Sequence, residues 1–284
     1  MEFLSPDQFL AHCRQNPVPG PVAAVFVDST LDVSDTIHHH LSLGFATIVV
    51  FAPPGTVDPG HDAMRVPWHA GANPVSEVLN VLNLVLEGRW IYWCFAGERL
   101  IYPYCETRKI GDALAFHETE RRWSMPTTTV DLYPGHLHEM LDAPGFDDMH
   151  LDGRGYYALA RNDPGTSERL DRQDNIFGGL RRRFKHHVPA PQRSLNRVSL
   201  FRADPSLTHG ADLRFNVQEL NTYSCPWHRN LTAATMSQRA AYALATNPRS
   251  QSEIDDLMWD GSVRFENSSQ QLLKLGLIEP GQWF

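Results

Sequence analysis

Residues 22–51, VAAVFVDSTLDVSDTIHHHLSLGFATIVVF, contain two short apolar runs separated by a polar, helix-like segment. The runs at residues 22–27 and 45–51 are too short for helices and rich in β-branched residues, so they predict buried parallel strands. Between them, residues 34–43 have helical spacing, and Gly44 is placed to end a helix. This stretch therefore predicts a β-α-β unit with tight connections.

The same alternation continues through the first half of the chain. It predicts strands at residues 64–66, 90–95 and 126–132, and helices at residues 74–86 and 110–123. Strands that alternate with helices in this way predict a doubly wound α/β fold, with a Rossmann-like, mostly parallel sheet and helices on both faces.

The pattern becomes less regular beyond about residue 140. It predicts a strand at residues 156–160 and helices at residues 231–245 and 268–275. These last helices predict a C-terminal helical cover over the sheet. We expect the 284 residues to form a single domain with one large core.

Open α/β sheets bind their ligands outside the carboxyl ends of the strands. Asp28 and Ser29 follow the first predicted strand, and Gly97 and Glu98 follow the strand at residues 90–95. We therefore expect a ligand site at this edge of the sheet.

Charge and composition exclude several classes of protein. A formal net charge of −8 and a pI near 5.9 argue against nucleic acid as a partner of the whole molecule. The four cysteines lack CxxC spacing, no signal peptide opens the chain, and no apolar run approaches the roughly 20 residues of a transmembrane helix. We expect a cytoplasmic location, with peripheral association at the inner face of the membrane as an alternative.

No glycine-rich phosphate loop follows any predicted strand, which argues against a P-loop and against a GxGxxG dinucleotide site. A phosphate-bearing ligand would then need cations or a metal. Arg181, Arg182 and Lys185 belong to a basic segment that could neutralise a pyrophosphate, or could be a solvated face.

The histidines do not predict a metal site. His38, His39 and His40 are adjacent, so on a helix they face different directions, which favours packing and capping roles. Cys225 and His228 have ligand-like spacing, but two ligands alone do not make a zinc site. A metal-dependent hydrolase is therefore a weaker hypothesis than those below.

Residues 90–103, WIYWCFAGERLIYP, resemble the segment of family 2 glycosyltransferases in which a strand ends in Asp-x-Asp-Glu and continues to Tyr-Pro. In that family the two aspartates hold Mn²⁺ or Mg²⁺ against the donor pyrophosphate. Here Phe95 and Gly97 stand at those two positions, and only Glu98, which matches the residue after the motif, keeps a carboxylate. The resemblance thus implies a GT-A fold with a degenerate metal motif and no certain cofactor.

Further segments resemble the same family between about residues 22 and 231. DSTLDVSDTIHHHLSLGFATIVVF is similar to its first β-α-β unit, TTTVDLYPGHL to its Asp-x-Tyr-Pro strand, LNRVSLFR to a later basic strand and CPWHRNL to a histidine-containing segment. The matching positions are Asp35, His39, His40, Asp131, Tyr133, Arg197, Arg202 and His228.

The resemblance implies transfer of a sugar from a nucleotide-sugar donor to a glycan, a lipid-linked acceptor or another hydroxylated acceptor, as in polysaccharide biosynthesis. Residues 20–140 would bind the nucleotide sugar, and residues 141–284 would form the acceptor side. The expected roles fall on residues named above: Asp28 and Ser29 for the nucleoside, Arg181, Arg182 and Lys185 for the leaving diphosphate, Asp131 or Glu98 as the base, and His228 on the substrate side.

The missing aspartates keep a second hypothesis open. A relative that has kept the fold and lost transfer would act as a glycan-binding or partner-binding protein, and Phe95 and Gly97 are its main support.

Overall fold

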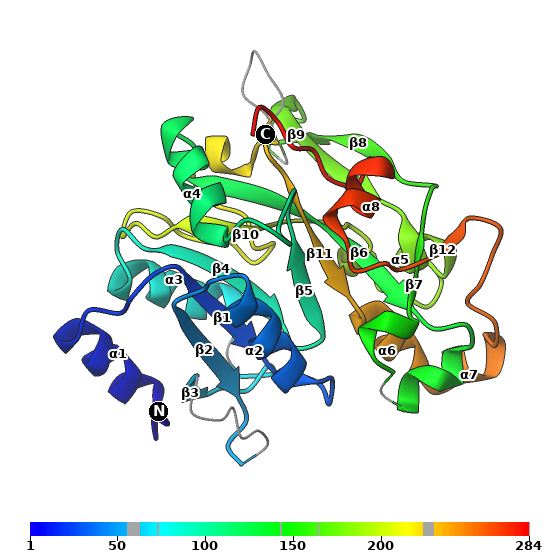
Figure 1. Cartoon of the computed structure of the whole chain (residues 1–284), viewed down its shortest axis with the longest axis horizontal. Helices are drawn as coiled ribbons and strands as arrows, with labels where there is room; N and C mark the ends of the chain where they lie inside the picture. The colour runs from blue at the N-terminus through cyan, green and yellow to red at the C-terminus, as the bar shows by residue number, and fades with distance from the viewer. Residues whose placement is uncertain (56–62, 73, 143, 164, 224–229, 284) are drawn as a thin grey trace. The chain divides into compact units, whose positions relative to one another are not determined.

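The computed structural model describes residues 1–55, 63–72, 74–142, 144–163, 165–223 and 230–283 (Figure 1). The chain forms two compact units, each assembled from three separate segments. The first unit comprises Met1–Arg99, Cys105–Pro126 and Arg197–Asn221, and the second comprises Leu100–Tyr104, Thr127–Asn196 and Thr222–Phe284. These two units are defined by contacts and not by ligand binding. The predicted functional halves, a nucleotide-sugar half up to about residue 140 and an acceptor half after it, therefore stay a prediction.

A mostly parallel sheet forms the centre of the first unit, with strand order β10-β4-β1-β2-β3. Strand β1 pairs in parallel with β2 and with β4, and β2 pairs in parallel with β3, whereas β10 is antiparallel to β4. The bounds are β1 Val22–Phe26, β2 Thr47–Ala52, β3 Met64–Pro67, β4 Trp90–Phe95 and β10 Asn196–Arg202. The parallel strands predicted from the apolar runs are confirmed within this unit.

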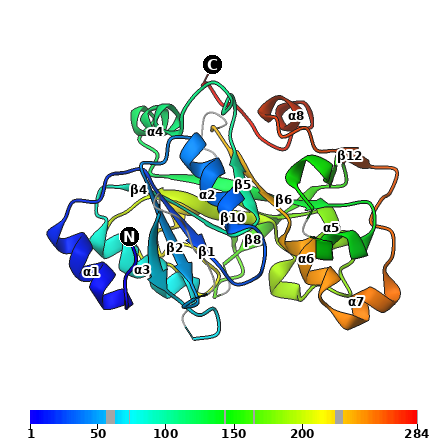
Figure 2. The ribbon, with the colours of Figure 1, turned by 60° about the horizontal axis from the view of Figure 1, so that its bottom comes forward.

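Helices cover both faces of this sheet (Figures 1 and 2). Helix α1, Pro6–Gln15, and helix α3, Val75–Val85, contribute Phe9, Leu79 and Leu82 to a core that also contains the side chains of one face of the strands. On the other face, His40 of α2, Val33–Ser42, stacks on Tyr92 of β4 with 5.0 Å between ring centroids. Helix α4, Ile110–Thr119, and the short helix η4, Gln218–Asn221, also belong to this unit.

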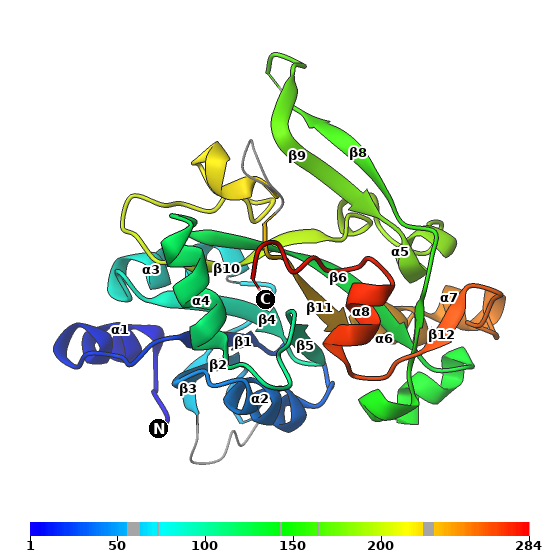
Figure 3. The same cartoon turned by 45° about the horizontal axis from the view of Figure 1, so that its top comes forward.

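The second unit contains a smaller mixed sheet. Strand β6 pairs in parallel with β11 and antiparallel with β7, and β7 pairs antiparallel with β12. Strands β8 and β9 form a separate long ribbon, visible in Figure 3. The bounds are β6 Ser124–Tyr133, β7 His150–Asp152, β8 Tyr157–Asn162, β9 Arg169–Phe177, β11 Ala233–Ser237 and β12 Ser262–Arg264.

Short helices complete the second unit. They are η1 Leu137–Asp142, η2 Phe146–Asp148, α5 Gly179–Arg183, η3 Ala190–Gln192, α6 Arg239–Ala245, α7 Pro248–Glu253 and α8 Ser269–Lys274, and the strand β5, Glu98–Ile101, leads into this unit from β4. The helix predicted at residues 268–275 is therefore confirmed as α8.

The helix predicted at residues 231–245 is wrong in its first half. Residues 233–237 form the buried strand β11, and only Arg239–Ala245 is helical. Every residue of β11 is buried, polar Thr235 and Ser237 included, and a strand buried on both faces lacks the alternation of core-facing apolar and exposed polar residues by which periodicity identifies a strand.

Among the residues that the structure describes, no helix combines the length and the apolar character needed to cross a bilayer.

Candidate functional site

The carboxyl ends of β1, β2 and β4 meet at one edge of the sheet in the first unit. Phe26, the last residue of β1, is paired with Phe51 near the end of β2 and with Phe95 at the end of β4. The N–H of Ala96 donates a hydrogen bond of 2.9 Å to the carbonyl of Phe26. The loop after β1 therefore leaves the sheet beside the turn that follows β4.

Asp28 and Ser29 lie in that loop. The Asp28 side chain is exposed, whereas Ser29 Oγ is shielded from solvent and has no hydrogen-bond partner among the described residues. A shielded hydroxyl without a partner loses hydration and gains nothing in return, so an acceptor or donor supplied by a ligand would stabilise it.

Gly97 forms the turn after β4 for a steric reason. Its φ is +76°, and a Cβ atom added there would lie 2.7 Å from Cδ1 of Leu31. Its N–H donates to Oγ1 of Thr36 at 3.0 Å. The position therefore requires glycine, and an aspartate could not simply be restored at it.

Glu98, the residue after Gly97, is buried and hydrogen-bonds within the same turn. Its carboxylate accepts the N–H of Phe95 at 2.8 Å and Nη2 of Arg197 at 2.8 Å. The Arg197 guanidinium in turn lies over the Trp93 ring, 4.3 Å from its centroid. Through these contacts Glu98 stabilises the turn after β4.

The residues at the resembling positions do not fit a divalent metal. Mn²⁺ and Mg²⁺ need several oxygen ligands, but Phe95 has no ligand atom, Gly97 has no side chain and Glu98 is engaged with Arg197. Nor does the described part of the chain contain a group of three or more His, Cys, Asp or Glu side chains that could hold a metal ion.

Asp131, on β6 in the second unit, is fully buried. Nε of Arg181 donates to its Oδ1 at 3.0 Å, and the backbone N–H of Arg181 approaches Oδ2 at 3.4 Å. Gly179 has a φ of +61°, and a Cβ atom there would lie 3.0 Å from the same Oδ2. Burial raises the pKa of Asp131, an effect that Arg181 only partly offsets. Such a carboxylate is a stronger base than an exposed one.

A second buried carboxylate, Asp152 at the end of β7, collects more donors. It accepts hydrogen bonds from the Tyr133 hydroxyl, from Nε1 of Trp259 at 2.8 Å and from Nε and Nη2 of Arg183, both at 3.0 Å. Asp152 is not among the residues expected from the sequence. Its partners lie 19 to 107 residues away along the chain, so no local pattern indicates it.

Tyr156 belongs to the same cluster. Its hydroxyl is shielded and has no hydrogen-bond partner among the described residues. Burial raises the pKa of Tyr156 well above its ordinary value, and the nearby Asp152 and Asp131 raise it further. Gly178 allows the ring to approach, because a Cβ atom there would lie 2.3 Å from Cδ1 of Tyr156. The hydroxyl stays neutral and is available as a donor.

The basic segment is divided between interior and surface. Arg181 and Arg183 each pair with one of the buried aspartates, at 3.0 Å. Arg182 and Lys185 are exposed; Arg182 donates to the carbonyl of Gly155 at 3.1 Å. Neither Arg182 nor Lys185 forms an ion pair with a carboxylate within the described ranges. The segment is therefore not one uniform solvated face.

The remaining predicted positions include two that the structure does not describe and one buried histidine. His228 and Cys225 lie outside the described residues. His40 is buried and contacts the carbonyl oxygen of Thr36 through Nδ1 at 2.7 Å, consistent with a packing role. Burial lowers its pKa to about 3, so the ring is neutral.

Comparison with known proteins gives little guidance. No protein-family model matches the chain, and no curated protein matches it. Among solved structures, UTP-bound UGPase from Acinetobacter baumannii shares 9% sequence identity, with a TM-score of 0.33 over 82% of this chain and 96% of that one. At this score the likeness is weak.

Proposed function

We propose that the chain transfers a sugar from a nucleotide-sugar donor to a glycan or another hydroxylated acceptor, without an Asp-x-Asp metal site. The observation that carries this proposal is the alignment of the carboxyl ends of β1, β2 and β4. Ligands of open α/β sheets bind outside such ends. Asp28 would accept hydrogen bonds from the nucleoside, and Ser29 Oγ would gain the partner that it lacks.

The second unit supports the acid-base part of the proposal by itself. Asp131 would take the proton of the acceptor hydroxyl, because its raised pKa makes it a stronger base than an ordinary aspartate. Glu98 is the other candidate; like Asp131 it is buried and ion-paired with an arginine, but it also holds the N–H of Phe95 in the turn after β4. His228 keeps its proposed place on the substrate side.

The leaving diphosphate would meet cations instead of a metal. Within the basic segment, Arg182 and Lys185 are the exposed candidates, because Arg181 and Arg183 are committed to Asp131 and Asp152. An arginine can bind a phosphate group through two parallel hydrogen bonds.

A calorimetric titration with UDP, GDP and their common sugar conjugates, with Mn²⁺ or with EDTA, tests the proposal. One nucleotide should bind equally well under both conditions, and Asp28→Asn should weaken this binding. Glu87→Gln, which neutralises an exposed carboxylate before the start of β4 at the opposite end of the strands, is the matched control. If no nucleotide binds in either condition, the proposal fails.

That negative outcome would favour the non-catalytic alternative, a glycan-binding or partner-binding protein. The turn at Gly97 supports this alternative. Glycine is sterically required there, so the position has no room for the metal-binding aspartate of the glycosyltransferases that the sequence resembles.

A further inference from the structure

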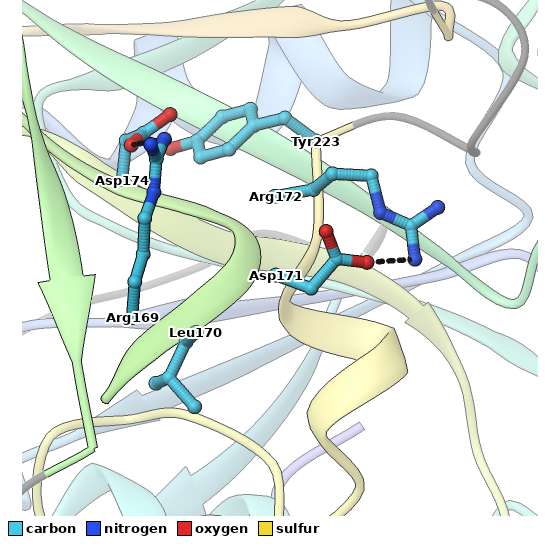
Figure 4. A pocket seen from close by; sticks show the side chains of 6 residues that line it. All are labelled: Arg169, Leu170, Asp171, Arg172, Asp174 and Tyr223. Carbon is cyan, nitrogen blue, oxygen red and sulfur yellow. Dashed lines mark ion pairs between the residues drawn. The ribbon is translucent and has the colours of Figure 1, made fainter.

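A groove lies along β9 in the second unit (Figure 4). Its volume is about 540 Å³, within the range of roughly 300–1,000 Å³ that is usual for small-molecule sites. The groove is open to solvent and lined by Arg169, Leu170, Asp171, Arg172, Asp174 and Tyr223.

Arg172 carries two unfavourable features in this groove. Its φ is +52°, in the left-handed region that a long side chain rarely adopts. Its Nε is shielded from solvent and has no hydrogen-bond partner in the described part of the chain. Strained backbone of this kind concentrates at sites that bind ligands.

The charges of the groove cancel over short distances. Nη2 of Arg172 lies 2.7 Å from Oδ2 of Asp171, and Nη2 of Arg169 lies 3.6 Å from Oδ1 of Asp174. An anionic ligand would meet the exposed carboxylate of Asp171, and a cationic ligand would meet the guanidinium groups. The groove therefore favours a ligand without net charge.

The same pairs offer hydrogen bonds of both kinds. A guanidinium has five N–H donors and a carboxylate has about four lone pairs, so each pair retains unused capacity. A sugar hydroxyl is both donor and acceptor, and it can bond to an aspartate and an arginine at once. The Tyr223 ring, which Figure 4 shows beside Asp174 and the end of Arg169, supplies apolar surface for the C–H face of a pyranose, and Leu170 contributes a further apolar side chain to the lining.

We propose that this groove binds an uncharged segment of a glycan, with the Asp–Arg pairs bonding to sugar hydroxyls. The inference rests on the proposed function in one respect, that the bound glycan is the acceptor of the transfer. An open groove suits a chain of sugars, whereas an enclosed pocket would suit a single sugar.

The test is a titration of the full chain, without nucleotide, with maltotetraose, cellotetraose and chitotetraose and with the acidic tetragalacturonate. At least one neutral tetrasaccharide should bind, and more tightly than tetragalacturonate. Arg172→Gly and Asp174→Asn should each weaken this binding by about tenfold or more, as expected for the loss of a hydrogen bond to a charged group. Glycine accommodates the left-handed backbone, so Arg172→Gly removes the guanidinium without disturbing the path of β9.

Arg249→Ala is the matched control, because Arg249 is an exposed arginine that pairs with Glu253 on α7. It should leave glycan binding unchanged. The inference is overturned if none of the neutral tetrasaccharides binds, if tetragalacturonate binds more tightly, or if Arg172→Gly binds like the unaltered chain.

The nucleotide titration described above separates the two failures. Glycan binding without nucleotide binding would support the glycan site in the groove and contradict the proposed sugar transfer. Nucleotide binding without glycan binding would support the proposed sugar transfer and contradict the glycan site.

Discussion

Asp131 and Arg181 form an ion pair in which the carboxylate is fully buried and Nε of Arg181 lies 3.0 Å from Oδ1 of Asp131. Removing one partner of such a pair leaves an uncompensated buried charge, which typically costs about 3–5 kcal/mol. We expect Arg181→Met to lower the free energy of unfolding by about that amount at pH 7.

The same substitution has a predicted pH dependence. Burial raises the pKa of Asp131 above its ordinary value of 3.8, and loss of Arg181 would raise it further. Well below the pKa of Asp131 in the unfolded chain, the carboxyl is protonated in both states, and the loss of Arg181 leaves no buried charge. As the pH rises toward the higher pKa of Asp131 in the folded chain, the loss of stability caused by Arg181→Met grows. Urea denaturation at pH 7 and pH 4.5 should show a smaller defect at pH 4.5. The double variant Arg181→Met/Asp131→Asn should recover much of the stability; an equal defect at both pH values would contradict the assignment.

Asp131 and Glu98 can be separated as candidate bases by their effects on turnover. Asp131→Asn should lower kcat for sugar transfer by about 100-fold or more, as for loss of a general base. Glu98→Gln should act mainly on stability, because Glu98 binds the N–H of Phe95 and the Arg197 guanidinium. Release of the nucleoside diphosphate gives the rate, and a melting curve of each variant gives the stability. A greater loss of kcat in Glu98→Gln would reverse the assignment.

Substitution of Gly97 should damage the fold and create no metal site. We expect Gly97→Ala to lower stability by about 1–3 kcal/mol, because the backbone is left-handed and Leu31 occupies the space. Phe95→Asp/Gly97→Asp should show no gain in Mn²⁺ binding by calorimetry. Gly111→Ala in α4, where a Cβ atom meets nothing within 4 Å, is the control and should raise stability by about 0.5–1 kcal/mol. Tolerance of alanine at position 97 would refute the steric argument.

Acid should destabilise the chain through a buried histidine. Burial lowers the pKa of His117 from 6.5 to about 3, so between these values the unfolded chain binds more protons than the folded one. Stability then falls as the pH drops through that window, by about 1.4 kcal/mol per pH unit for one such group. His117→Leu should flatten the pH dependence of the denaturation free energy by that slope. An unchanged pH slope in His117→Leu would contradict this assignment.

Arg172→Gly should increase stability while it removes glycan binding. Relief of the left-handed backbone should raise the free energy of unfolding by about 1 kcal/mol. Arg169→Gly, at a position of β9 without a positive φ, should instead lower it by about 0.5–1 kcal/mol. Chemical denaturation gives the free energy of unfolding of both variants. A lower free energy of unfolding in Arg172→Gly would contradict the inference that the backbone at Arg172 is strained.

The sequence predicts the first unit well because its signals are local. In residues 22–51, short apolar runs and a helix of ordinary length follow one another without a gap, and each corresponds to one element of the structure. At residues 233–237 the same kind of signal misleads, because burial on both faces removes the alternation by which an exposed strand is known.

The candidate site was only partly predictable. Asp131 was identified from a strand and a family resemblance, but its partner Arg181 lies 50 residues away, and Arg197 lies 99 residues from Glu98. The sequence leaves open whether the basic segment binds a pyrophosphate or is a solvated face, whereas the structure pairs Arg181 and Arg183 with buried aspartates. Such pairings depend on the path of the chain, which no local spacing encodes.

The interleaving of the two units has a consequence for synthesis on the ribosome. Strand β4 ends at residue 95, but its antiparallel neighbour β10 begins at residue 196, so 101 residues must be translated before that edge is covered. At roughly 5–20 residues per second, the nascent chain carries an open edge for on the order of 5–20 seconds. Unpaired edges recruit other strands. A polypeptide released before residue 196 would keep this edge open to pairing with strands of other chains.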